Sequence, residues 1–112
     1  MSATLLYRIA AFVFFVGCIG HTHHILSAQY GRVSRGLGLM ATASMLFWAF
    51  LSWHLGDLAP SAPGAIGALG WAFFAVQLAS VALSFLYFHL PAIVLSGLAA
   101  VIVGLAAGLA GR

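Results

Sequence analysis

The fold is decided by one long stretch without a formal charge, residues 58–111, which reads LAPSAPGAIGALGWAFFAVQLASVALSFLYFHLPAIVLSGLAAVIVGLAAGLAG. A helix that crosses about 30 Å of hydrocarbon needs roughly 20 apolar residues, so this stretch is long enough to cross a membrane twice. The break falls before Pro91, because proline disfavours the helical conformation in the preceding residue and is favourable at a first helical position. We therefore expect helices over 64–88 and 91–111.

Two shorter uncharged stretches, 9–31 and 36–56, lie on the N-terminal side of this one. Each is long enough for a single crossing, and we expect helices over 4–28 and 37–56. Short connections make consecutive helices antiparallel neighbours. The sequence therefore predicts an all-α fold, an integral membrane four-helix bundle with up-down-up-down topology, in a single transmembrane domain that covers 1–112.

The composition excludes most soluble folds. Hydrophobic residues make up 64% of the chain and charged residues only 4%, whereas roughly a quarter of the residues in a soluble domain are charged. The formal net charge of +3 comes from four basic residues and one acid, Asp57. So few charges cannot form a surface that follows a phosphate backbone, and nucleic acid is not an expected partner. Membrane lipids are the expected surroundings.

Small residues predict where the helices pack, because close backbone approach holds membrane helices together. In 64–88, five alanines recur at alternating spacings of four and three and form one seam. In 91–111, two glycines four residues apart form a small-xxx-small pair. The packing residues expected from these patterns are Ala68, Ala72, Ala75, Ala79, Ala82, Gly104 and Gly108. The stripe on the fourth helix could instead face a second copy, so a homodimer or larger membrane complex stays open.

Histidines are the most informative polar residues of the chain, which contains five of them and a single acid. Three lie in the last two turns of the first expected helix. At 100° per residue, His21 and His24 share an arc of about 100° with Gly17 and Gly20, which predicts that this small-residue face turns toward the bundle. His23 points away from the arc and is expected at the rim.

Other helices carry polar side chains at a similar depth, on the side of the first connection, which predicts a polar pocket in one leaflet. Its candidate ligand-binding residues are His21, His24, Gln77, Ser80, Ser84, Tyr87 and His89. Titratable groups inside a membrane are costly and are candidates for functional sites. The competing interpretation is structural, because serines in membrane helices often bond to their own backbone and histidines near helix ends often reach the headgroups.

Such a pocket allows several functions. In the first, a small binding or accessory membrane protein holds an amphiphile, with imidazoles bonding its polar head. In the second, His21 and His24 ligate a metal, a haem iron or a chlorin magnesium, in an electron-transfer subunit. Transport and catalysis are the remaining alternatives. An isomerase-like enzyme is less expected, because Asp57 lies on the far side and no other carboxylate can orient an imidazolium.

Three short motifs resemble those of a group of small bacterial four-helix membrane proteins: RIAA at 8–11, GHT at 20–22 and LYFHLPA at 86–92. The resemblance covers nearly the whole chain. It implies the fold and a bacterial inner membrane, and it draws attention to His21 without implying an activity. Length and topology are also similar to those of small multidrug-resistance exporters, which depend on a glutamate in the first helix, whereas this chain has no glutamate.

The arginines are balanced between the two ends of the expected bundle. Arg32 and Arg35 lie in the first connection, and Arg8 and Arg112 lie on the side of the termini. Positive charge in short connections favours the cytoplasmic side of a membrane. Because Arg32 and Arg35 belong to a short connection, we expect that connection to be cytoplasmic.

Overall fold

The computed structural model describes residues 2–87 and 90–110, and this part of the chain is built from helices. In chain order they are α1 (Ala3–Ser27), α2 (Arg32–Leu58), α3 (Pro63–Tyr87) and α4 (Leu90–Ala110). Each contains a span that is long and apolar enough to cross a membrane. The expected all-α, four-helix membrane bundle is confirmed.

Three helices begin and end within one residue of the expected positions, and the exception is α2. The sequence predicts its start at 37, after the two arginines, whereas the helix starts at Arg32 and continues to Leu58. Arginine is a good helix former, and its long side chain can carry the charge to the headgroups from a helical backbone. The charges therefore do not mark the start of the helix.

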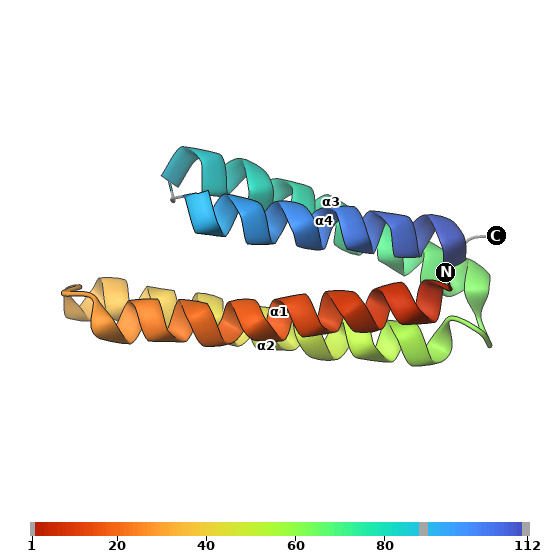
Figure 1. The fold of residues 1–112 in the computed structure, drawn as a ribbon, viewed down its shortest axis with the longest axis horizontal. Helices are drawn as coiled ribbons and strands as arrows, with labels where there is room; N and C mark the ends of the chain where they lie inside the picture. Colours follow the sequence, from red (N-terminus) through yellow and green to blue (C-terminus); the bar gives the residue numbers. More distant parts are fainter. Residues whose placement is uncertain (1, 88–89, 111–112) are drawn as a thin grey trace.

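The helices form two antiparallel hairpins, α1 with α2 and α3 with α4 (Figure 1). The hairpins are joined chiefly by α1 packing against α4, whereas α2 and α3 barely touch. Figure 1 shows that the hairpins lie close together at the end that holds both termini, here called the terminal end. They diverge toward the end that holds the α1–α2 connection, so the packing between them is concentrated at the terminal end.

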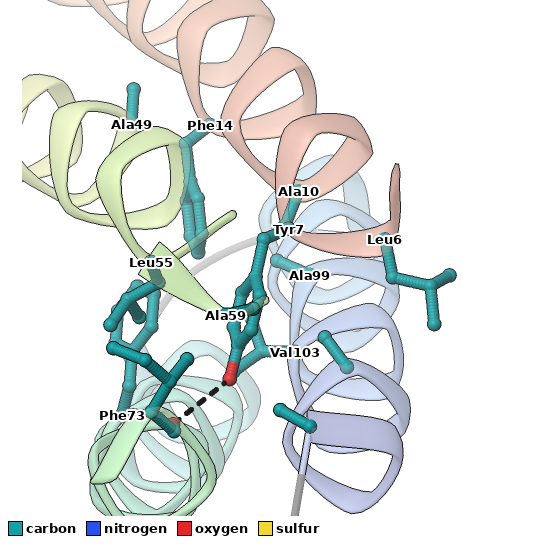
Figure 2. Packing of buried hydrophobic residues seen from close by; sticks show 13 residues of the cluster. Leu6, Tyr7, Ala10, Phe14, Ala49, Leu55, Ala59, Phe73, Ala99 and Val103 are labelled. Atoms are coloured by element: carbon teal, nitrogen blue, oxygen red, sulfur yellow. Dashed lines mark hydrogen bonds between the residues drawn. The ribbon is translucent and has the colours of Figure 1, made fainter. Parts of the chain in front are cut away.

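The core lies toward the terminal end, where large side chains of α1, α2 and α3 meet small residues of α4 (Figure 2). Tyr7 and Phe14 of α1 are buried there, and the ring of Phe14 lies 5.5 Å from that of Phe73 on α3. The buried residues of α4 are Ala99, Ala100, Val103, Ala106, Ala107 and Ala110. Their small size lets the helix backbones approach closely, which is how membrane helices associate.

The packing face of α3 differs from the expected one. The five alanines of the expected seam are all exposed: Ala68, Ala72, Ala75, Ala79 and Ala82. The buried face instead carries Gly70, whose added Cβ would meet the Tyr7 hydroxyl and lie 2.8 Å from the Cβ of Ala107. Glycine allows a closer approach than alanine, so the alanine seam is left facing outward. On α4, Gly104 and Gly108 lie beside aromatic rings of α3, which are 3.0 and 3.8 Å from where the added Cβ atoms would be.

Candidate functional site

His21 is half-buried on α1 and contacts α2. Its Nδ1 lies 2.8 Å from the Thr42 hydroxyl oxygen, and that hydroxyl lies 3.3 Å from the Gly38 carbonyl oxygen. A threonine hydroxyl has one proton. When this proton goes to Gly38, the histidine Nδ1–H donates to Thr42, and the lone pair of the neutral ring is on Nε2. The contact therefore orients the ring and couples its tautomer to the direction of the Thr42 hydroxyl.

His24 lies at the connection and not inside the bundle. Its side chain is exposed, and its Nε2 lies 3.0 Å from the hydroxyl oxygen of Tyr30, with the two rings edge to face. Tyr30 belongs to the short connection 28–31 and offers a partner outside the bundle. The contacts of His21 and His24 described here are therefore with different partners, although the sequence predicts both on one inward face. His23 is exposed.

The serines of the expected pocket bond to their own helices. Ser80 donates to the Val76 carbonyl at 3.1 Å, and Ser84 donates to the Ser80 carbonyl at 2.8 Å. Ser96 of α4 bonds to its own helix as well and lies 3.4 Å from the Ser84 hydroxyl. This i−4 pattern is common in membrane helices, and it favours the structural interpretation for Ser80 and Ser84.

Gln77 is the exception among the polar side chains of α3. Only 1% of its surface is exposed, and within the described residues its Nε2 has no hydrogen-bond partner. It lies one turn beyond Phe73 on the buried face of the helix. A buried amide donor without a partner costs roughly 1–3 kcal/mol in a protein. The Nε2 of Gln77 is therefore free to donate a hydrogen bond to a group from outside the described residues, and such a bond would remove this cost.

His21 and Gln77 lie at neighbouring depths on different hairpins. Helices α1 and α3 run in the same direction, and the packed rings of Phe14 and Phe73 set their register. From this level, His21 is seven residues along α1 and Gln77 is four residues along α3. The difference of three residues corresponds to about 5 Å along the bundle. The two side chains therefore lie at similar depths along the bundle axis.

Gly17 of α1 marks a level at which the two hairpins still touch. An added Cβ would lie 2.9 Å from Met45 Cε of α2 and 3.9 Å from Leu95 Cδ1 of α4. From there toward the α1–α2 connection the hairpins diverge (Figure 1). The His21 contact with Thr42 belongs to the first hairpin and Gln77 belongs to the second. The polar residues of the expected pocket therefore lie on both hairpins.

The described residues contain no group of three or more His, Cys, Asp or Glu side chains that could hold a metal ion. His21 and His24, the candidate metal ligands, contact different partners. A haem or chlorin needs only one imidazole from this chain, so that alternative stays a prediction. The side chain of Tyr87 and the whole of His89, which belong to the expected pocket, lie outside the described part of the chain.

At the terminal end lies a polar cluster that was not predicted from the sequence. Arg8 Nη2 donates to Asp57 Oδ1 at 2.9 Å, and the guanidinium lies over the Trp53 ring, 5.0 Å from its centre. Nearby, the Thr4 hydroxyl donates to the Gly56 carbonyl at 2.9 Å. The sequence contained a signal for the ion pair, because Arg8 near the start of the first helix and Asp57 after the second were both expected at this end of the bundle. The cluster joins the start of α1 to the end of α2.

Tyr7 is a buried polar group that no sequence signal distinguishes from an interfacial tyrosine. It has no exposed surface, and its hydroxyl donates to the Ile66 carbonyl of α3 at 3.4 Å (Figure 2). This bond connects the two hairpins. It also satisfies the hydroxyl, in contrast to the amide of Gln77.

No protein-family model, curated protein or solved structure matches this chain. The resemblance of the short motifs to small bacterial four-helix membrane proteins therefore stays a prediction.

Proposed function

We propose that this protein is an integral membrane binding protein or accessory subunit. It holds the polar head of a membrane-dissolved amphiphile between its two hairpins, at the depth of Gln77 and His21. The observation that carries the proposal is the Gln77 amide, which is 1% exposed and whose Nε2 has no partner among the described residues. Polar groups kept in hydrocarbon are costly, and in membrane helices they are functional candidates by default.

The side chains at the level of Gln77 favour a ligand whose polar head is uncharged and carries oxygen acceptors. Gln77 Nε2 donates, so the ligand must carry a carbonyl, ester or hydroxyl oxygen. The described residues place no arginine here, because Arg32 and Arg35 lie in the first turn of α2. Without a cation, a buried carboxylate or phosphate would be unpaired and costly. The ligand class is therefore a neutral amphiphile.

An apolar groove close to Gln77 along α3 supports a ligand that also has an apolar tail. It lies between α2 and α3, has a volume of about 270 Å³, and is lined by apolar side chains. Phe73 and Val76, both within one turn of Gln77, form part of its α3 wall, and Trp48 and Leu51 form part of its α2 wall. A hydrocarbon chain that lies in this groove would bring its polar head to the level of Gln77.

The test compares the lipids that co-purify with the wild type, Gln77→Met and Gln29→Met. Methionine keeps the length of the side chain and removes the donor. Gln29 is exposed in the α1–α2 connection, so its variant is a matched control. In mild detergent, mass spectrometry of extracted lipids should find one neutral lipid enriched in the wild type and the control. Gln77→Met should retain about tenfold less of it, the loss expected for one buried hydrogen bond. Equal retention by all three forms, or no enriched neutral lipid in the wild type, would refute the proposal.

A cofactor-binding subunit is the second candidate, supported by the orientation of His21. A histidine that ligates a metal usually donates its other ring nitrogen to a neighbouring group, and the Nδ1 contact with Thr42 is of that kind. The absorption spectrum of the protein purified from its native membrane tests this candidate. A Soret or chlorin band lost in His21→Leu and kept in His54→Leu would support it, and a colourless protein would exclude it.

The location in a bacterial inner membrane and the assembly state belong to the same proposal. The four apolar helices support a membrane protein in general, and the short motifs support the bacterial inner membrane. Gly104 and Gly108, a candidate surface for a second copy, face α3 of the same chain. A homodimer would therefore use another surface, and cross-linking in the native membrane would detect it.

A further inference from the structure

The two arginines at the start of α2 have no acidic partner among the described residues. Arg32 and Arg35 are exposed and lie three residues apart, on one side of the helix. The chain has one acidic residue, Asp57, which lies about 33 Å from Arg35 along the same helix at 1.5 Å per residue. Asp57 is already paired with Arg8 at 2.9 Å. The counter-charge for Arg32 and Arg35 must therefore come from outside the chain.

The surroundings of Arg32 and Arg35 place them at the headgroup level of a membrane. Val33 and Leu37, on the same turns of α2, are 77% and 62% exposed, so their apolar surface faces lipid tails. Tyr30 in the adjoining connection is also exposed, and amphipathic aromatic rings favour the membrane interface. Guanidinium groups beside exposed apolar side chains lie where phospholipids carry their phosphates.

We propose that Arg32 and Arg35, here called the basic patch, bind the phosphate groups of anionic phospholipids. A guanidinium donates two parallel N–H bonds to a phosphate, and basic residues next to a membrane span are attracted to an anionic leaflet. Lipid is favoured over an acidic protein segment because Val33 and Leu37 beside the patch leave exposed apolar surface that acyl chains can cover. The single described arginine of the terminal end is neutralised by its aspartate. The basic patch thus keeps the α1–α2 connection in the leaflet that is rich in anionic lipids.

The test is native mass spectrometry of the full chain released from detergent micelles with defined lipids. Phosphatidylglycerol and phosphatidylcholine with identical acyl chains are the probes. The wild type should prefer phosphatidylglycerol about 30-fold, because each arginine near an anionic surface contributes a factor of about five. The double variant Arg32→Gln/Arg35→Gln should lose this preference. The control Arg8→Gln/Asp57→Asn removes the ion pair without changing the net charge and should keep it.

A preference that survives in Arg32→Gln/Arg35→Gln, or that falls equally in the control, would overturn the proposal. Two competitors at constant ionic strength distinguish other anions. Displacement of phosphatidylglycerol by millimolar inorganic phosphate would assign the basic patch to free phosphate, and displacement by a micromolar hexaglutamate peptide would assign it to an acidic protein segment. Either result would also overturn it. Because the patch lies apart from Gln77, retention of the neutral lipid should be unchanged in the double variant, so the two proposals fail separately.

Discussion

Replacement of Gly70 by alanine should loosen the contact between the hairpins at the terminal end. The added Cβ would meet the Tyr7 hydroxyl and would lie 2.8 Å from the Cβ and 3.2 Å from the Cα of Ala107. Overpacking of this kind costs about 1–3 kcal/mol. Displacing the Tyr7 hydroxyl from the Ile66 carbonyl costs about 1 kcal/mol more, and the better helix propensity of alanine returns about 1 kcal/mol. The net expectation is a loss of about 1–3 kcal/mol in the free energy of unfolding.

Unfolding in mixed micelles, followed by circular dichroism and tryptophan fluorescence, measures this loss. Gly97→Ala on α4 is the matched control, because no neighbouring atom of the described residues lies within 4 Å of its added Cβ. That variant should gain up to about 1 kcal/mol from helix propensity alone. Adding Tyr7→Phe to Gly70→Ala removes the oxygen that the new methyl group meets and should recover part of the loss. If Gly70→Ala is as stable as Gly97→Ala, the described contact is refuted.

Four further outcomes can be measured by the same unfolding assay. Gly104→Ala, whose Cβ would lie 3.0 Å from an aromatic ring of α3, should lose about 1 kcal/mol. In Gly108→Ala the added Cβ would lie 3.8 Å from the nearest neighbouring atom, an ordinary van der Waals distance, so this variant should gain up to about 1 kcal/mol. A Gly108→Ala variant less stable than Gly104→Ala would contradict the packing. Arg8→Gln should cost less than about 1 kcal/mol, because the side chains of its ion pair with Asp57 are 46% and 41% exposed; a loss above about 2 kcal/mol would contradict this. In ligand-free protein, Gln77→Met should leave the stability unchanged or raise it by about 1 kcal/mol, because it removes a buried donor without a partner; a loss above about 2 kcal/mol would point to a structural partner for Nε2.

The helices could be predicted because hydrocarbon imposes a strict rule on the backbone. Every backbone polar group must be satisfied inside its own segment, so uncharged length sets the number of crossings. The same reasoning fails at the start of α2, where Arg32 and Arg35 lie inside the helix. Charge shows where a span leaves the hydrocarbon, and it carries no information on where the helix ends.

The rotation of each helix was harder to predict than its length. An alanine seam such as Ala68 to Ala82 and a glycine such as Gly70 both permit close packing, and the sequence does not rank them. In the structure Gly70 receives the Tyr7 side chain from α1, and this tertiary contact decides the face. Packing partners far apart in the sequence thus override a local pattern.

The polar residues, too, are identified by the local sequence, whereas their contacts depend on the tertiary structure. Gln77 stands out in the sequence as an amide within an apolar helix, but the absence of a described partner for it is visible only in three dimensions. His24 shares a helical face with His21, yet Tyr30 from the connection gives it a partner outside the bundle. Sequence spacing therefore identifies the polar residues. It does not show which of them find a hydrogen-bond partner in the folded chain.

Selective ¹⁵N labelling of glutamine tests the ligand site most directly, because the chain has two glutamines, Gln29 and Gln77. Gln29 is exposed, so its side-chain amide is an internal reference for the amide of Gln77 in one NMR spectrum. Neutral lipid extracted from the native membrane is added to lipid-free protein in detergent. We expect a downfield shift of a Gln77 Nε2 proton, as it gains an acceptor, while the Gln29 signals stay in place. A Gln77 signal that does not move with any neutral lipid fraction would contradict the claim that this donor binds a membrane-dissolved ligand.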